Sequence, residues 1–153
     1  MDRPTAIEKI RDACNQLAST VTSIHPLTPA LADKPTQDEI FTREVRDAYF
    51  DFNKADIRAD ARTALAQTAQ YLRSYPNERV TVEGHCDERG STEYNLALGD
   101  RRASAVKQYL VSLGISGDRI NTDSFGKEKP FCMQSTEDCY QQNRRGHFIR
   151  AKQ

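Results

Sequence analysis

One segment, from Gly84 to Leu110, constrains the fold of this chain most; its sequence is GHCDERGSTEYNLALGDRRASAVKQYL. Alternating apolar residues from Arg79 to Cys86 predict a β-strand that leads into it. Its last third repeats apolar residues at helical spacing and predicts an amphipathic helix. Arg102 falls in the middle of the apolar face of that helix, so we expect its guanidinium to point towards the protein interior. A buried arginine is costly unless a carboxylate or a ligand anion meets it.

The turn between this strand and this helix carries the nearest plausible partners of Arg102. Asp87 and Glu88 follow the strand directly, and Ser91 or Thr92 is expected to cap the helix. A strand end, a carboxylate, a helix start and an inward arginine together predict a small charged pocket, which is the candidate site. A buried structural ion pair between Asp87 and Arg102 is the alternative, and the residues alone leave both interpretations open.

The rest of the chain predicts strands and helices in alternation. Aromatic residues favour a strand at 45–52, and an apolar stripe favours a helix at 60–74 with Asp60 as its N-cap. Further elements are expected as a short helix at 36–44, strands at 119–126 and 147–151, and a short helix introduced by a capping box at 135–138. The order β-α-β-α-β-(α)-β predicts an α/β (α+β) two-layer sandwich, with the helices on one face of a four-stranded sheet. Strands separated by a long helix are expected to pair in parallel.

The N-terminal segment, residues 1–35, is expected to lie outside the main domain, which we place at 36–153. Apolar residues at 5–23 recur in steps of three and four and predict a helix, followed by a proline-containing linker at 25–34. That helix either packs on its own domain or pairs in a dimer, and its short stripe favours local packing. The first residues lack the basic-then-apolar pattern of a signal peptide, so the chain is either cytosolic or exported by a signal outside this sequence.

Composition and side-chain chemistry exclude several classes of function. The 22 Lys and Arg residues balance 22 Asp and Glu residues and are scattered, which argues against nucleic acid as a partner. No apolar run approaches the ~18 residues of a membrane span. His85 and Cys86 are neighbours in a strand and point to opposite faces, so a cysteine nucleophile with a histidine base is not expected. The cysteines and histidines show no zinc-ligand spacing, so we expect no metal.

Cys132 and Cys139 are close enough in the sequence to form a disulfide. Closing a loop of about eight residues destabilises the unfolded chain by ~2.5 kcal/mol in the chain-entropy model. The alternative is a pair of free thiols in a reducing compartment; the disulfide is favoured and fits an oxidising one. Cys14 and Cys86 are then expected to remain thiols.

Several motifs in a fixed order resemble one known family. The segment from Gly84 to Leu110, together with YFDFNKADI before it and SFGKEKP and NRR after it, resembles the OmpA-like peptidoglycan-binding domain over about residues 47–150. Within that family the likeness is strongest to its outer-membrane lipoproteins. The resemblance implies the same two-layer fold and a non-enzymatic binding module without a cofactor.

The resemblance also implies a ligand and the residues that hold it. In the family, the aspartate of the GHxD motif and the arginine fifteen residues later hold the diaminopimelate of the peptidoglycan stem peptide; these are Asp87 and Arg102 here. A carboxylate suits the ammonium of diaminopimelate, and the planar guanidinium suits its carboxylate. Further implied contacts are an aromatic wall, an apolar wall and one polar residue: Phe52, Leu98 and Asn53. Backbone N–H groups at the helix start near Thr92 are expected to add contacts to the ligand carboxylate. Asn53 stands where the family has an aspartate, so that contact loses a charge.

By the same resemblance, the protein is expected to tether the outer membrane to the cell wall from the periplasmic side. The implied partners are the peptidoglycan stem peptide and a periplasmic β-propeller protein of the TolB type, with a lipid anchor outside this sequence. Cys14 is not expected to carry that anchor, because no apolar leader precedes it. The alternative is the wall-binding module of a flagellar-motor stator or of another envelope protein with this fold.

Overall fold

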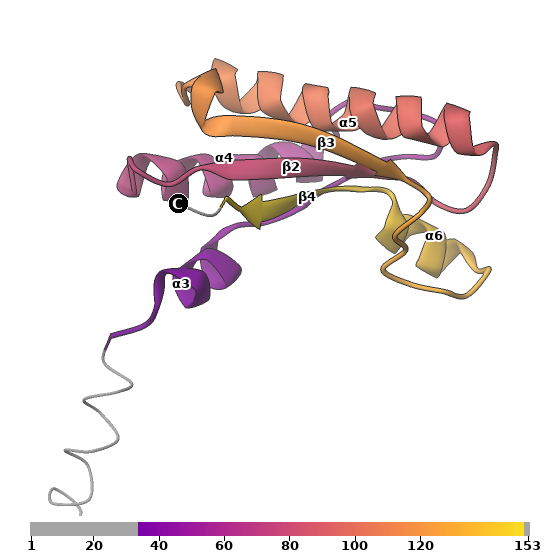
Figure 1. Cartoon of the computed structure of the whole chain (residues 1–153), viewed down its shortest axis with the longest axis horizontal. Helices are drawn as coiled ribbons and strands as arrows, with labels where there is room; N and C mark the ends of the chain where they lie inside the picture. The colour runs from indigo at the N-terminus through magenta and orange to yellow at the C-terminus, as the bar shows by residue number, and fades with distance from the viewer. Residues whose placement is uncertain (1–33, 152–153) are drawn as a thin grey trace, which may run out of the picture. The chain divides into compact units, whose positions relative to one another are not determined.

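The computed structural model describes residues 34–151. The predicted helix at 5–23, nearly all of the predicted linker and Cys14 lie outside these residues, and the domain boundary at 35/36 stays a prediction. None of the helices in the described part is both long enough and apolar enough to cross a membrane. The elements, labelled in Figure 1, are α3 (Gln37–Glu44), β1 (Ala48–Tyr49), α4 (Ala59–Ser74), β2 (Val80–His85), α5 (Thr92–Ser112), the 3-10 helix η1 (Gly117–Arg119), β3 (Ile120–Gly126), α6 (Glu137–Asn143) and β4 (Arg145–Arg150).

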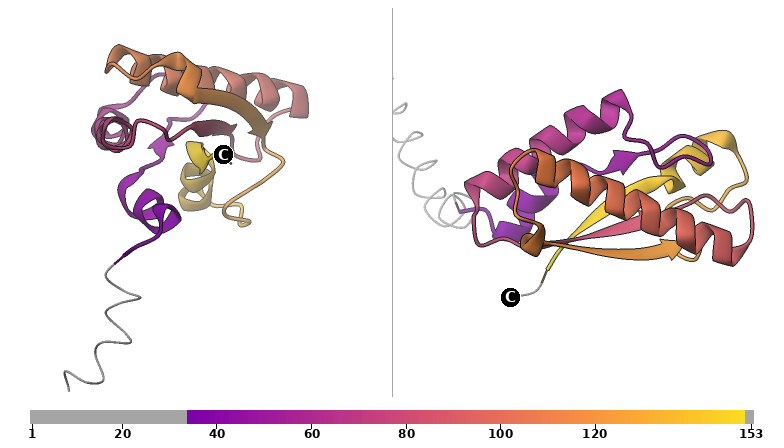
Figure 2. Two further views of the ribbon diagram at one scale, coloured as in Figure 1. Left: turned by 60° about the vertical axis from the view of Figure 1, so that its left-hand side comes forward. Right: turned by 90° about the horizontal axis from the view of Figure 1, so that it is seen from above.

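A four-stranded mixed sheet forms one layer of the domain, in the order β1-β4-β2-β3. β2 and β3 run parallel, as predicted for strands joined by a long helix, and β4 is antiparallel to both of its neighbours, β1 and β2. Helices α4 and α5 lie side by side on one face of the sheet, as Figures 1 and 2 show. The predicted two-layer α+β sandwich is therefore confirmed.

Apolar side chains of the two helices and the inner face of the sheet form the core. Val80 and Val82 alternate with polar residues along β2 and are fully buried. They belong to one cluster with apolar residues of both helices and of the neighbouring strands, among them Leu65, Leu72, Val106, Leu110, Ile120 and Phe148. Removing these side chains from water is what holds α4 and α5 on this face of the sheet.

The first strand is much shorter than predicted, since β1 has two residues where the aromatic pattern predicts a strand at 45–52. Before β1, the Thr68 hydroxyl accepts a hydrogen bond from Arg46 N (3.0 Å) and donates one to Arg46 O (3.1 Å), in place of a partner strand. After β1, the chain turns at Asn53, which has a positive φ of 60°. Phe52 consequently leaves the sheet, and it lies beside the candidate pocket.

Of the helices α4, α5 and α6, only α5 begins after the residue predicted as its N-cap. Helix α5 begins after Ser91, whose Oγ accepts from a backbone N–H three residues on (3.1 Å), as predicted. Helix α6 is capped by Thr136 rather than Ser135, so it begins one residue later than the capping box predicts. Helix α4 begins after Arg58 and not after Asp60, whose carboxylate lies in the first turn and pairs with Arg58 at 2.6 Å. A carboxylate is favourable there as well, because the first turn exposes unpaired N–H groups.

The first half of α5 packs directly against the backbone of β2 through two glycines. A Cβ atom on Gly84 would overlap the carbonyl group of Gly99, and one on Gly99 would overlap Ser124 Oγ. Ser124, in β3, donates from that hydroxyl to Leu96 O at 2.7 Å. This close approach is possible only without side chains, and it brings the end of β2 next to the inner face of α5.

Cys132 and Cys139 form a disulfide, as predicted. Asn143 holds the same loop: its Oδ1 accepts from Phe131 N (2.7 Å) and Cys132 N (3.0 Å), and its Nδ2 donates to Cys132 O (2.8 Å). Cys86 is a buried free thiol. The disulfide and the Asn143 amide together fix the loop against α6.

Alkylation under denaturing, non-reducing conditions should label two of the four cysteines, Cys14 and Cys86, because the other two are joined. Mass spectrometry of the intact protein counts the labels. A sample reduced before alkylation should carry four, and four labels without reduction would contradict the disulfide.

Candidate functional site

A cavity of about 330 Å³ opens where β2 ends and α5 begins. Five of the six ligand contacts expected from the sequence line it: Phe52, Asn53, Asp87, Leu98 and Arg102. The sixth, Thr92, is not among the lining residues and is exposed on the first turn of α5. The other lining residues are Cys86, Arg89, Gly90, Tyr94 and Asn95. The site thus combines three segments, namely the turn after β1, the turn after β2 and the first turns of α5.

Asp87 is 3% exposed, and its carboxylate is paired with two arginines. Arg89 donates to Oδ1 from its backbone N (3.0 Å) and Nε (3.1 Å), and to Oδ2 from Nη2 (2.8 Å). Arg144 donates to Oδ2 from Nη1 (3.2 Å). Burial raises the pKa of Asp87, but the hydrogen bonds from Arg89 and Arg144 outweigh it and hold the pKa below the usual aspartate value. Asp87 is therefore ionised at neutral pH.

Arg102 is fully buried, as predicted, but it does not pair with Asp87 or Glu88. Its guanidinium donates instead to three backbone carbonyls, from Nε to Lys54 O (2.8 Å), from Nη1 to His85 O (2.9 Å) and from Nη2 to Asp51 O (3.0 Å). Glu88 accepts hydrogen bonds from hydroxyls of α6 and the loop before it. Burial lowers the pKa of Arg102. The alternative interpretation, a buried ion pair between Asp87 and Arg102, is therefore not what the structure has: the turn after β1 folds over the guanidinium and supplies carbonyl oxygens as acceptors.

Arg144, directly after α6, supports Asp87 from behind. Its side chain is 4% exposed, as is that of Asp87, so the pair is shielded from water. Arg144 also donates from Nε to Phe50 O (2.9 Å) and from Nη2 to Glu137 (3.1 Å). These bonds leave Arg144 little freedom to move, and they fix the position of the Asp87 carboxylate.

Arg89 covers the outer side of Asp87. Its guanidinium carbon lies 4.0 Å from the ring centre of Phe52 and 4.4 Å from that of Tyr140, so the group is held between two aromatic rings. The Arg89 side chain is nevertheless 37% exposed. Its hydrogen bond to Asp87 raises the pKa of Arg89.

The remaining wall of the cavity comes from α5 and the turn after β1. Leu98 is 3% exposed and gives the predicted apolar surface. Asn53 accepts a hydrogen bond from the Tyr94 hydroxyl through Oδ1. Asn95 is buried and donates from Nδ2 to two backbone carbonyls of the turn after β2 (2.9 and 3.0 Å), which fixes that turn against the helix.

His85 and Cys86 point to different sides of the sheet, as predicted. Cys86 donates from Sγ to Asn95 O at 3.2 Å, and burial raises the pKa of its thiol. His85 Nε2 lies 3.1 Å from Glu83 Oε1 on the other side, where the His85 ring stacks on Phe125; burial lowers the pKa of His85. A protonated thiol without a nearby base does not make a nucleophile. Within residues 34–151, no group of three or more His, Cys, Asp or Glu side chains is arranged to hold a metal ion.

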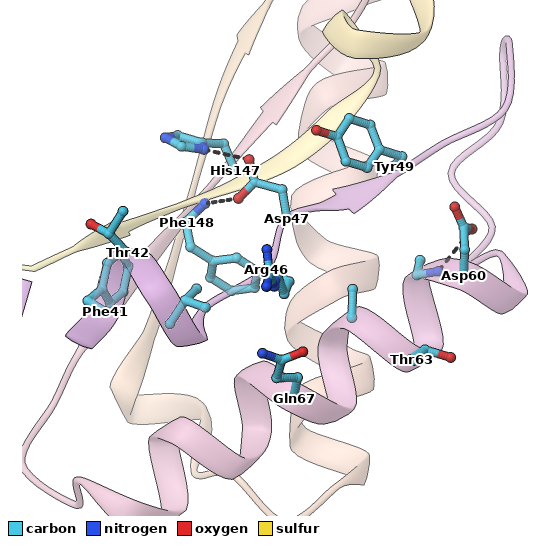
Figure 3. A pocket seen from close by; sticks show the side chains of 13 residues that line it. Phe41, Thr42, Arg46, Asp47, Tyr49, Asp60, Thr63, Gln67, His147 and Phe148 are labelled. Atoms are coloured by element: carbon cyan, nitrogen blue, oxygen red, sulfur yellow. Dashed lines mark hydrogen bonds and ion pairs between the residues drawn. The ribbon is translucent and has the colours of Figure 1, made fainter. Parts of the chain in front are cut away.

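A larger hollow, of about 630 Å³, lies between β1, β4 and α4 (Figure 3). None of the ligand contacts predicted from the sequence lines it. Figure 3 shows Asp47 using both of its oxygens within the wall: Oδ2 lies 2.7 Å from His147 Nδ1, and Oδ1 accepts from Phe148 N at 3.3 Å. The cavity at Asp87 and Arg102 therefore remains the candidate site.

Most of the two-layer α+β fold, with the charged pocket between the end of β2 and the start of α5, lies within a segment that a known protein family accounts for. The model of the OmpA family matches residues 49–144, and the chain belongs to the OmpA family. A relative from Rhizobium meliloti named "Peptidoglycan-associated lipoprotein" is 50% identical over 115 residues, which cover 74% of this chain and 65% of the relative. The chain thus spans just under two thirds of the length of that relative. The resemblance stated from the sequence is confirmed.

Solved structures of related proteins share the fold. The crystal structure of the peptidoglycan-associated lipoprotein from Burkholderia pseudomallei is 40% identical and matches with a TM-score of 0.66, covering 69% of this chain and 90% of that one. The C-terminal domain of Helicobacter pylori MotB matches with a TM-score of 0.64, covering 69% of this chain and 83% of that one. Its identity is 17%, so that likeness shows the fold alone.

The sequence did not indicate every residue that shapes the site. Arg89 is half-buried in a turn and Tyr94 is exposed on the first turns of α5, so no periodic pattern marks them as part of a pocket. Asn95 is a polar residue on the buried face of an amphipathic helix, which is a signal that could have been used. Arg144 belongs to the NRR motif, but only the structure places it against Asp87.

Proposed function

We propose that this protein binds peptidoglycan non-covalently through the diaminopimelate of the stem peptide. The observation that carries the proposal is that the Asp87 carboxylate and the Arg89 and Arg102 guanidiniums line one cavity of about 330 Å³. The free amino-acid end of diaminopimelate presents an ammonium and a carboxylate a few atoms apart. A carboxylate in the wall matches the ammonium, and guanidinium groups match the carboxylate through charge-assisted hydrogen bonds.

Membership of the OmpA family and the names of the relatives support a role at the cell wall. We infer that the protein tethers the outer membrane to the wall from the periplasmic side, through a lipid anchor. A periplasmic β-propeller protein of the TolB type is the protein partner that the family implies. Binding is reversible and needs neither a cofactor nor a catalytic residue.

Co-sedimentation with purified sacculi tests the proposal. The protein should sediment with sacculi that contain diaminopimelate and should stay in solution with sacculi that contain lysine at the same position. Free diaminopimelate should release the sedimented protein in proportion to its concentration. Equal sedimentation with both kinds of sacculi would contradict recognition through diaminopimelate.

Asp87→Asn should weaken binding to diaminopimelate-containing sacculi by about 2 kcal/mol, or roughly 30-fold, because the ammonium loses its charged partner. The amide oxygen replaces only one of the two accepting oxygens and the amide nitrogen then faces an arginine donor, so we also expect a loss of stability of about 3 kcal/mol, and affinity is compared on the folded fraction. Asp100→Asn is the matched control, because it removes the same charge from an exposed position of α5 that does not line the cavity. Equal affinities of the two variants would contradict a role of Asp87 in binding.

The same carboxylate sets a low-pH limit on binding. The arginines hold the pKa of Asp87 below the usual value of about 3.9, so Asp87 stays ionised under conditions that protonate an ordinary aspartate. A lowered pKa means that its contribution is complete above the usual value and disappears as the pH falls through the lower, folded-state value. Sedimentation should therefore be constant from neutral pH down to about 4 and should decline only below that.

A further inference from the structure

In the structure the Asp87 carboxylate has no acceptor position left for a ligand. Oδ1 accepts from Arg89 N (3.0 Å) and Nε (3.1 Å), and Oδ2 accepts from Arg89 Nη2 (2.8 Å) and Arg144 Nη1 (3.2 Å). A carboxylate offers about four lone-pair positions, and these four donors occupy them. An incoming ammonium can bond to Asp87 only if one donor leaves.

Arg89 is the donor that can leave. Arg144 is 4% exposed and also donates to Phe50 O at 2.9 Å and to Glu137 at 3.1 Å. The Arg89 side chain is 37% exposed and, among residues 34–151, is held apart from Asp87 only by the faces of two aromatic rings and by Glu137 at 3.9 Å. The Arg89 guanidinium borders water and that of Arg144 does not, so Arg89 is the side chain that can turn away from Asp87 at the smaller cost, while Asp87 keeps its hydrogen bond from Arg144.

We infer that Arg89 occupies the place of the ligand ammonium and that binding exchanges ion pairs, making Arg89 a specificity-determining residue. This inference rests on the proposed function, since it concerns the same cavity. The ligand ammonium replaces the Arg89 guanidinium on Asp87, and the released guanidinium takes the ligand carboxylate. The number of ion pairs is conserved only when the ligand carries both charges side by side.

The hydrogen bonds that Arg102 already makes support the role of Arg89 as the partner of the ligand carboxylate. Three of its five N–H groups already donate to backbone carbonyls, and the residue is fully buried. Arg102 therefore has at most two N–H groups left for a ligand carboxylate. Arg89, once released from Asp87, has its whole planar fork free at the mouth of the same cavity.

The exchange predicts how the site tells diaminopimelate from lysine. The side-chain end of diaminopimelate supplies an ammonium for Asp87 and a carboxylate for Arg89. A lysine side chain supplies the ammonium alone, so its binding leaves Arg89 without a partner. Arg89 thus disfavours a ligand that carries only an ammonium, such as lysine, and favours one that carries an ammonium and a carboxylate side by side, such as diaminopimelate.

Arg89→Gln tests the inference with two stem tripeptides, one ending in diaminopimelate and one in lysine. Both are amidated at the main-chain carboxyl, so that only the side-chain ends differ. The variant should bind the lysine peptide about tenfold more tightly than the unmodified protein does, because no guanidinium has to be displaced from Asp87. Affinity for the diaminopimelate peptide should change less than threefold. The variant loses the guanidinium that competes with the ligand ammonium for Asp87, but it also loses the guanidinium that pairs with the ligand carboxylate. NMR titration of the full chain measures both affinities even when they are weak.

Arg101→Gln is the matched control, since it removes the same charge from the exposed face of α5 outside the cavity. It should leave both affinities unchanged, and thermal melts should show all proteins folded. Unchanged affinity for the lysine peptide in Arg89→Gln would overturn the inference. A tenfold loss for the diaminopimelate peptide alone would also overturn it, by making Arg89 a simple ligand contact. Failure of the unmodified protein to bind the diaminopimelate peptide would instead refute the proposed function itself.

Discussion

Arg102→Lys should lower the free energy of unfolding by about 3 kcal/mol or more, because one ammonium cannot reach the three carbonyls that the guanidinium bridges. Hydrogen bonds from a charged donor contribute about 1.5–3 kcal/mol each, and lysine replaces at most one or two of them. The carbonyls left without a donor belong to Lys54, His85 or Asp51, all close to the cavity. Denaturant titration of the variant and of the unmodified protein measures the difference.

Arg101→Lys is the control for this variant, because Arg101 is exposed on the same helix. We expect it to change the free energy of unfolding by no more than about 0.5 kcal/mol. Ligand affinity is then measured on the folded fraction of Arg102→Lys. A loss of affinity beyond the loss of stability would show that Arg102 also contacts the ligand. Stability within 1 kcal/mol of the unmodified protein would contradict the structural role of its three hydrogen bonds.

Gly84→Ala should destabilise the domain by at least about 3 kcal/mol, since its Cβ would overlap the carbonyl group of Gly99. Both atoms belong to rigid elements, so relief requires that the first half of α5 move away from β2. Such a movement also separates the turn that carries Asp87 from the helix that carries Arg102. Thermal unfolding should therefore show a lower Tm, and any protein that still folds should bind wall fragments poorly.

Gly117→Ala is the control for Gly84→Ala, because the added methyl group would meet Lys107 and Val111 at 3.6 and 3.8 Å, which are ordinary contact distances. We expect it to change stability by less than about 1 kcal/mol. If Gly84→Ala were equally mild, the close packing of α5 on β2 would have to be more adaptable than the glycine contact indicates.

The strand, turn and helix around Asp87 could be predicted closely because their signals are local. Alternation marks β2, Ser91 caps α5 through its own first turn, and the apolar stripe places Arg102 on the inner face. The cysteine spacing likewise predicted the disulfide between Cys132 and Cys139 correctly. Each of these predictions depends on residues only a few positions apart.

The contacts of the two central side chains could not be predicted, because their partners come from distant parts of the chain. The carbonyls that meet Arg102 include those of residues 51 and 54, which a turn at Asn53 brings over it. Arg144 reaches Asp87 from 57 residues away. Periodicity shows which face of a helix is buried, but it does not show which backbone groups lie above that face.

The disulfide also bears on the thermodynamics of ligand binding. Helix α6 has only seven residues and is too short to be stable by itself, yet Tyr140 within it contacts Arg89, and Arg144 just after it holds Asp87. The bond from Cys139 to Cys132 and the Thr136 cap hold this helix in place before any ligand arrives. The residues that support Asp87 and Arg89 are thus ordered in advance: the entropy of ordering them is lost during folding and is not a cost of association.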